Sequence, residues 1–168
     1  MSGLKNYGSL FIFAMMSVLL LAGCNTATTD EIVDYNNEFF ITDYLAETET
    51  MIDLWDELEA VYLEDAYEER AIFYEHELVP QAEKIVDLVK NKKIEAEELQ
   101  EVHNLLVQSE EAQLASFEKE LLYLQGDAED EALAEEFYDL DDESYELHNE
   151  FIEAYEELFE RFNVEKEE

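Results

Sequence analysis

Glycine and proline, the residues that most often interrupt regular structure, almost vanish from this chain beyond residue 30. The stretch 31–168 contains one glycine, Gly126, and one proline, Pro80. A β-sheet protein of this size needs many more turn residues, whereas Glu, Leu and Ala, which are frequent here, favour helices. The sequence therefore predicts an all-α protein.

Apolar residues recur at helical spacings of three and four along most of this stretch. The longest series ends the chain and comprises Tyr145, His148, Phe151, Ile152, Tyr155, Leu158, Phe159 and Phe162. Similar series lie in residues 51–62 and 99–124. Helices with one apolar face bury it against one another, so we expect an antiparallel up-down bundle of three or four long helices.

Two helix boundaries can be placed from the sequence. Gly126 suits a left-handed cap after one helix, and Asp127 suits the start of the next. Lysines at 90–93 followed by glutamates at 95–98 complement the dipoles of a helix that ends and one that begins. These signals predict helices over 95–125 and 128–163. Pro80 is expected as a kink or near the first turn of the preceding helix.

The stretch 30–91 has no turn signal except Pro80. As one straight helix it would measure about 90 Å, roughly twice the length of the later helices. Half of it would then expose an apolar patch formed by Phe39, Phe40, Ile41, Met51, Leu54 and Trp55. Either the chain folds back near residues 63–67, which gives four matched helices, or the overhang packs against a partner. The sequence leaves the oligomeric state open.

Acidic residues dominate the charge. The chain carries 46 Asp and Glu against 9 Lys and Arg, a formal charge of −37. Disordered acidic chains are poor in apolar residues, but here hydrophobic residues make up 48%, which favours a folded domain. Nucleic-acid binding is excluded, because phosphate recognition needs concentrated Lys and Arg. Attraction to anionic lipid is disfavoured for the same reason, and a solvated, solubilising surface is the simplest interpretation.

The only cysteine of the chain follows an uncharged apolar run. Lys5 precedes this run, LFIFAMMSVLLLA at 10–22, which is too short to span a bilayer and is typical of a signal peptide. The run leads into Leu21-Ala22-Gly23-Cys24, and this motif resembles the lipobox of bacterial lipoprotein precursors. The resemblance covers about 24 residues.

The resemblance implies a lipid anchor. Cleavage would fall between Gly23 and Cys24, and the Cys24 sulfur would carry a diacylglyceryl group with fatty acids such as palmitate. Two acyl chains give stable membrane attachment. The implied division is a signal peptide at 1–23, a lipidated cysteine and tether at 24–30, an acidic helical bundle at 31–163 and a charged tail at 164–168. The protein is then expected on the extracytoplasmic side of the cell membrane.

No motif points to catalysis or to a cofactor. None of the three histidines, His76, His103 and His148, has the Glu-x-x-His spacing of a helical metal site. His103 and His148 are expected at the interface or the edge of the core. The tyrosines, among them Tyr35, Tyr44, Tyr62, Tyr67 and Tyr74, are either core residues with hydroxyls at the rim or a stacking strip for peptide or glycan. We therefore expect no enzymatic activity.

The strongest acidic signal lies in residues 127–143. Asp139, Asp141 and Glu143 have the alternate spacing of a calcium loop but lack its turn glycine. They are candidates for weak cation contact rather than a built metal site.

Two functions follow from these observations. The first is a non-enzymatic lipoprotein whose bundle contacts an envelope protein or a cell-wall component. In architecture and composition the mature part resembles small all-helical lipoproteins of bacilli described as cell-wall-binding. The alternative is an acidic module that binds divalent cations or cationic peptides.

Overall fold

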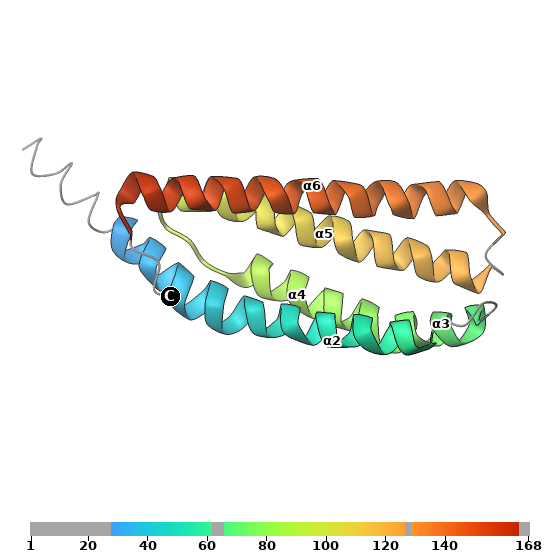
Figure 1. Cartoon of the computed structure of the whole chain (residues 1–168). Helices are drawn as coiled ribbons and strands as arrows, with labels where there is room; N and C mark the ends of the chain where they lie inside the picture. Colours follow the sequence, from blue (N-terminus) through green and yellow to red (C-terminus); the bar gives the residue numbers. More distant parts are fainter. Residues whose placement is uncertain (1–27, 62–65, 127–128, 165–168) are drawn as a thin grey trace, which may run out of the picture.

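The computed structural model describes residues 28–61, 66–126 and 129–164, and these residues are helical apart from short connections. They contain no strand, which confirms the all-α prediction. Four long helices run up and down in turn, as Figure 1 shows. The first comprises helical residues 28–34, η1 (Tyr35–Tyr44) and α2 (Leu45–Val61); the second comprises α3 (Tyr67–Phe73), η2 (Tyr74–Leu78) and α4 (Val79–Asn91). The third and fourth are α5 (Glu97–Gln125) and α6 (Glu131–Phe162).

The chain folds back between α2 and α3. Residues 62–65 lie outside the described residues, but contacts on both sides establish the antiparallel pair. The Gln81 amide donates hydrogen bonds to the Glu47 backbone oxygen at 2.9 Å and to its carboxylate at 3.0 Å. The Lys84 ammonium lies 2.7 Å from the same carboxylate. Of the two alternatives for 30–91, the fold-back with four helices is therefore confirmed.

The fold-back covers most of the apolar patch that a single helix would expose. Phe39 and Met51 are buried, and Phe40, Leu54 and Trp55 are partly buried against the core. Ile41 stays 46% exposed.

Both early helices contain a π-helical segment. In such a segment the i→i+5 hydrogen bonds widen each turn by about one residue. In η1 this widening brings Tyr35, Phe39 and Tyr44, spaced by four and five, onto one buried face. The second segment, η2, ends two residues before Pro80, which has no N–H to donate to the preceding turn. Pro80 thus lies within a continuous helix, next to a widened turn.

The predicted helix boundaries are correct to within a few residues, but the caps differ. Gly126 follows α5 with φ −91°, so the predicted left-handed glycine is wrong. The left-handed cap is Asn163, at φ 52°, after α6. The capping aspartate of α6 is Asp130, whose carboxylate accepts hydrogen bonds from the Ala132 and Leu133 amides at 3.1 Å. Asp127 lies outside the described residues.

The α4–α5 connection is held in place by hydrogen bonds to Glu31, a residue far from it in the sequence. The Glu31 carboxylate accepts hydrogen bonds from the Glu95 amide at 2.6 Å and the Ala96 amide at 2.8 Å. These amides precede α5 and would otherwise lack a helical partner. Residues 28–30, which the sequence assigns to the tether, are helical and extend this first helix toward Cys24.

The four helices form two pairs. The closest pair is α5 with α6, and α2 lies beside α4. Serines permit the close approach of α5 and α6: Ser109 and Ser116 are buried and donate to the Ser144 and Phe137 backbone oxygens at 3.0 and 2.9 Å. In the part of the chain that the structure describes, no helix has the length and apolarity of a membrane span.

Asp130 provides a test of the capping scheme. Replacing Asp130 by Ala should lower the free energy of unfolding by about 1 kcal/mol, because two amides lose their acceptor. Urea unfolding of the full chain measures this change. Glu129→Ala is the control, since it removes the same charge from an exposed neighbouring position. Equal effects of the two variants would contradict the assignment of Asp130 as the cap.

Candidate functional site

The predicted lipidation and cleavage residues, Cys24 and Gly23, lie outside the described residues, as does Tyr62. The structure therefore neither adds to nor removes from the lipobox interpretation. The first helix, whose described part begins at residue 28, starts at the end of the bundle where α6 ends and α5 begins (Figure 1).

The three acids predicted for weak cation contact lie in the first half of α6. Asp139, Asp141 and Glu143 are all exposed. On a helix, residues four apart share a face but residues two apart do not, so Asp141 points away from the other two. Its carboxylate accepts a hydrogen bond from the Gln113 amide at 3.1 Å. Within the described ranges, no three His, Cys, Asp or Glu side chains are placed to hold a metal ion together.

The histidines occupy three different environments. His76 is exposed, whereas His148 is half-buried. His103 is fully buried and joins three helices: its Nε2 donates to the Val89 backbone oxygen at 2.9 Å, so its Nδ1 accepts from the Tyr35 hydroxyl at 2.8 Å. Burial lowers the pKa of His103 below its usual range, with Lys92 nearby adding to the effect. His103 thus lies inside the core and not at its edge, where the sequence placed it.

Two glutamates of α5 are held in the bundle by tyrosine hydroxyls. Tyr44 donates to Glu110 at 2.6 Å, and Tyr74 donates to Glu120 at 2.6 Å. Glu120 also pairs with Arg70 at 2.9 Å. Burial raises the pKa of both carboxyls, although the tyrosine hydrogen bonds oppose this rise. Of the tyrosine alternatives, these two are core residues with bonded hydroxyls rather than parts of an exposed strip.

A groove opens between α2 and α6. It has a volume of about 260 Å³. Its floor is formed by α4 and α5 and includes Ile85, Phe117 and the carboxyl-bearing Glu110, and its sides include Thr48, Met51 and Trp55 on α2 and Asp141, Tyr145 and His148 on α6. We call this the α2–α6 groove. It combines an apolar lining with two carboxylates, Glu110 and Asp141, and thus suits a ligand with both apolar and cationic parts.

Exposed apolar side chains border the α2–α6 groove on both sides. On α2, Ile52 is 55% exposed and lies one helical turn from Thr48 and Trp55. On α6, Tyr145 is 70% exposed, and Tyr138 lies two turns earlier on the same face at 62%. Toward the other end of the molecule η1 contacts α6, since the ring centroids of Phe40 and Tyr155 lie 5.2 Å apart.

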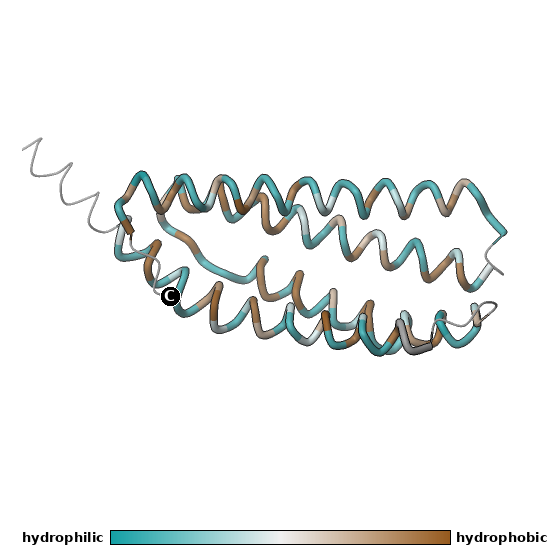
Figure 2. The backbone as a smooth tube through the Cα atoms, in the orientation of Figure 1, coloured by the Kyte–Doolittle hydropathy of each residue, from teal (hydrophilic) through white to brown (hydrophobic). Residues whose placement is uncertain are grey.

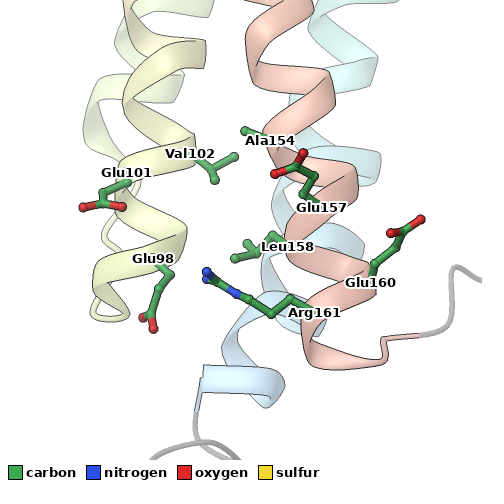
Figure 3. Close-up of a pocket in the computed structure, with 8 residues that line it drawn as sticks. All are labelled: Glu98, Glu101, Val102, Ala154, Glu157, Leu158, Glu160 and Arg161. Carbon is green, nitrogen blue, oxygen red and sulfur yellow. The ribbon is translucent and has the colours of Figure 1, made fainter.

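A second, larger groove lies between α5 and α6 at the end of the bundle. Its volume is about 620 Å³, with an apolar floor of Val102, Ala154 and Leu158 and four glutamates around it: Glu98, Glu101, Glu157 and Glu160. Arg161 extends from α6 across this groove toward α5 (Figure 3). The chain thus supplies its own cation here, which makes the α2–α6 groove the better candidate site.

Sequence reasoning did not identify the α2–α6 groove. It assigned Tyr145 and Phe151 to one apolar face of the last helix, but Phe151 is fully buried whereas Tyr145 is mostly exposed. The available signal was the heptad spacing of Tyr138 and Tyr145, which places two aromatic residues beside the core stripe instead of within it.

The comparisons provide no family assignment, since no family model matches the chain and neither a curated protein nor a solved structure shows significant similarity to it.

The partly buried Glu110 carboxyl should make the stability of the bundle depend on pH. Burial raises the pKa of Glu110 in the folded chain. The contribution of Glu110 to the free energy of unfolding is therefore fully present below its unfolded pKa, near 4.3. That contribution is lost as the pH rises through the folded pKa. Glu110→Gln should therefore raise the melting temperature at pH 7, and this gain should vanish near pH 4. Thermal unfolding monitored by circular dichroism measures both values.

The control for this test is Glu118→Gln, which removes the same charge from an exposed position of α5. It should raise the melting temperature at pH 7 by less than Glu110→Gln does. A lower melting temperature of Glu110→Gln at pH 7 would mean that the charged Glu110 carboxylate stabilises the bundle, which would contradict the prediction.

Proposed function

We propose that this protein is a lipid-anchored, non-enzymatic binding module on the extracytoplasmic side of the cell membrane. Its partner is an envelope protein or a cell-wall component that presents cationic groups. The lipid on Cys24 supplies the membrane attachment, and the helical bundle supplies the binding surface. The proposal joins the lipobox motif to the charge distribution of the folded domain.

The charge of α6 is the observation that carries the choice of partner. This helix contains thirteen Asp and Glu residues, all exposed, and one basic residue, Arg161. Figure 2 shows hydrophilic residues along its whole length. Of the basic residues outside α6, Lys84, Lys90 and Lys119 each pair with a glutamate. A surface of one sign along a helix of about 48 Å favours a partner of the opposite sign.

The buried ionisable groups support a binding role. His103, Glu110 and Glu120 are buried or partly buried candidates for acid–base chemistry, and each joins helices through hydrogen bonds within the bundle. Groups used in this way hold the fold in register. The exposed carboxylates of α6 are left as the chemical feature presented to a partner.

The anchor is tested at Cys24. Cells that express the full chain are fed an alkyne analogue of palmitate, and the label on the protein is measured. The wild-type chain should carry the label and sediment with membranes. Cys24→Ala should remain an unlabelled, uncut precursor, whereas the neighbouring control Thr26→Ala should behave as wild type. A labelled and normally cut Cys24→Ala product would contradict the anchor.

The partner is tested by affinity capture from envelope fractions with the detergent-solubilised full chain. Reversal to Lys of three exposed acids of α6, Glu135, Asp142 and Glu146, should abolish capture of the partner. The matched control reverses three exposed acids elsewhere, Glu83, Asp87 and Glu118, and should retain it. Circular dichroism checks that both variants stay helical. Capture of neither a protein nor a wall polymer by the wild-type chain at low salt would overturn the proposed function.

A further inference from the structure

Among the described residues, the α2–α6 groove is a long edge of the bundle that the four helices leave open. The α5–α6, α4–α5 and α2–α4 pairs are packed, but α2 and α6 make no comparable contact. The consequence is visible in the side chains: Ile52, which borders the groove on α2, is 55% exposed, and Tyr145, which lines it on α6, is 70% exposed. An additional helix lying along this edge would bury both residues and would complete a five-helix arrangement.

The rim of the groove specifies the charge of that helix. The neighbours of Ile52 on its own helix face include Glu49 and Asp56, and those of Tyr145 include Asp141 and Asp142. All four acids are exposed. Each apolar wall residue is therefore flanked by carboxylates, and Glu110 adds another in the floor. The complementary surface is a helix with an apolar stripe bordered by Lys or Arg on both sides.

We infer that the α2–α6 groove binds one basic amphipathic helix of a partner protein. A second copy of this chain is opposed by charge, since its helices carry the same excess of acids. The inference rests on the proposed function, because it assigns a site and a chemical class to the partner. It adds that recognition requires apolar contact in the groove and not acidic charge alone.

The chain contains a built-in reporter for this site. Trp55 is its only tryptophan and lines the groove. The full chain in neutral detergent is titrated with an 18-residue helical peptide of Leu, Lys, Ala and Gln whose leucines form one stripe. We expect a saturable blue shift of Trp55 emission with one peptide bound per chain. A peptide of equal composition with scattered leucines, and one with Glu in place of Lys, should give no saturable shift.

Four variants test where on the molecule the peptide binds. Ile52→Glu and Tyr145→Glu should each weaken binding about tenfold, which corresponds to about 1.4 kcal/mol. The controls Ile72→Glu and Leu122→Glu add the same charge at residues that are 52% and 54% exposed but neither line nor border the groove, and they should bind as wild type. If charge attraction alone bound the peptide, each added glutamate would leave the peptide affinity unchanged or raise it.

The outcomes separate this inference from the proposed function. If the striped peptide binds but all four variants behave alike, the groove is not the site, whereas acidic recognition of a partner stands. If the chain self-associates through Ile52 and Tyr145 and excludes the peptide, the occupant is a second copy and the inference is wrong. If no cationic peptide binds at any salt concentration, both the inference and the cationic partner are overturned.

Discussion

A shortage of cations constrains this structure more than any other feature. The chain has 46 acidic residues and 9 basic ones, so most of its carboxylates have no ammonium or guanidinium to pair with. On α5 the Tyr44 hydroxyl binds Glu110 in place of a cation, and the Tyr74 hydroxyl binds Glu120 beside Arg70. Both tyrosines come from the π-helical segments, Tyr44 at the end of η1 and Tyr74 at the start of η2. The irregular turns thus carry the contacts that hold the first two helices to the third.

The same constraint explains why one edge of the bundle stays open. The helices α5 and α6 approach closely through Ser109 and Ser116, and aromatic rings join η1 to α6 at one end. Between α2 and α6 there is no comparable contact, and the facing surfaces carry acids on both sides, which repel at short range. Closing this edge would bring those acids together. A basic helix would relieve the repulsion, so the stability of the fold and its proposed partner have one physical cause.

Much of the fold was predictable because it depends on local signals. The scarcity of glycine and proline and the apolar spacing predicted helices, and the lysines before residue 94 predicted the α4–α5 break. The π-helical segments were not predicted, because apolar spacing at three and four does not reveal a spacing of five such as that from Phe39 to Tyr44. The contacts of Glu31 with the α5 start and of Tyr44 with Glu110 join residues more than sixty positions apart, and no local pattern encodes them. The α2–α6 groove was missed for the same reason, since it depends on which helices fail to meet.

The most direct test of an open, acidic groove is the collisional quenching of Trp55 in the full chain without any partner. The neutral quencher acrylamide reports whether the groove is open. Comparison of a cationic quencher, caesium, with an anionic one, iodide, reports the charge of the groove. We predict that acrylamide and caesium quench Trp55 readily at low salt, while iodide quenches it poorly. Absence of quenching by acrylamide would show that the groove is closed. Equal quenching by caesium and iodide would show that it is not acidic, and either result would contradict the account.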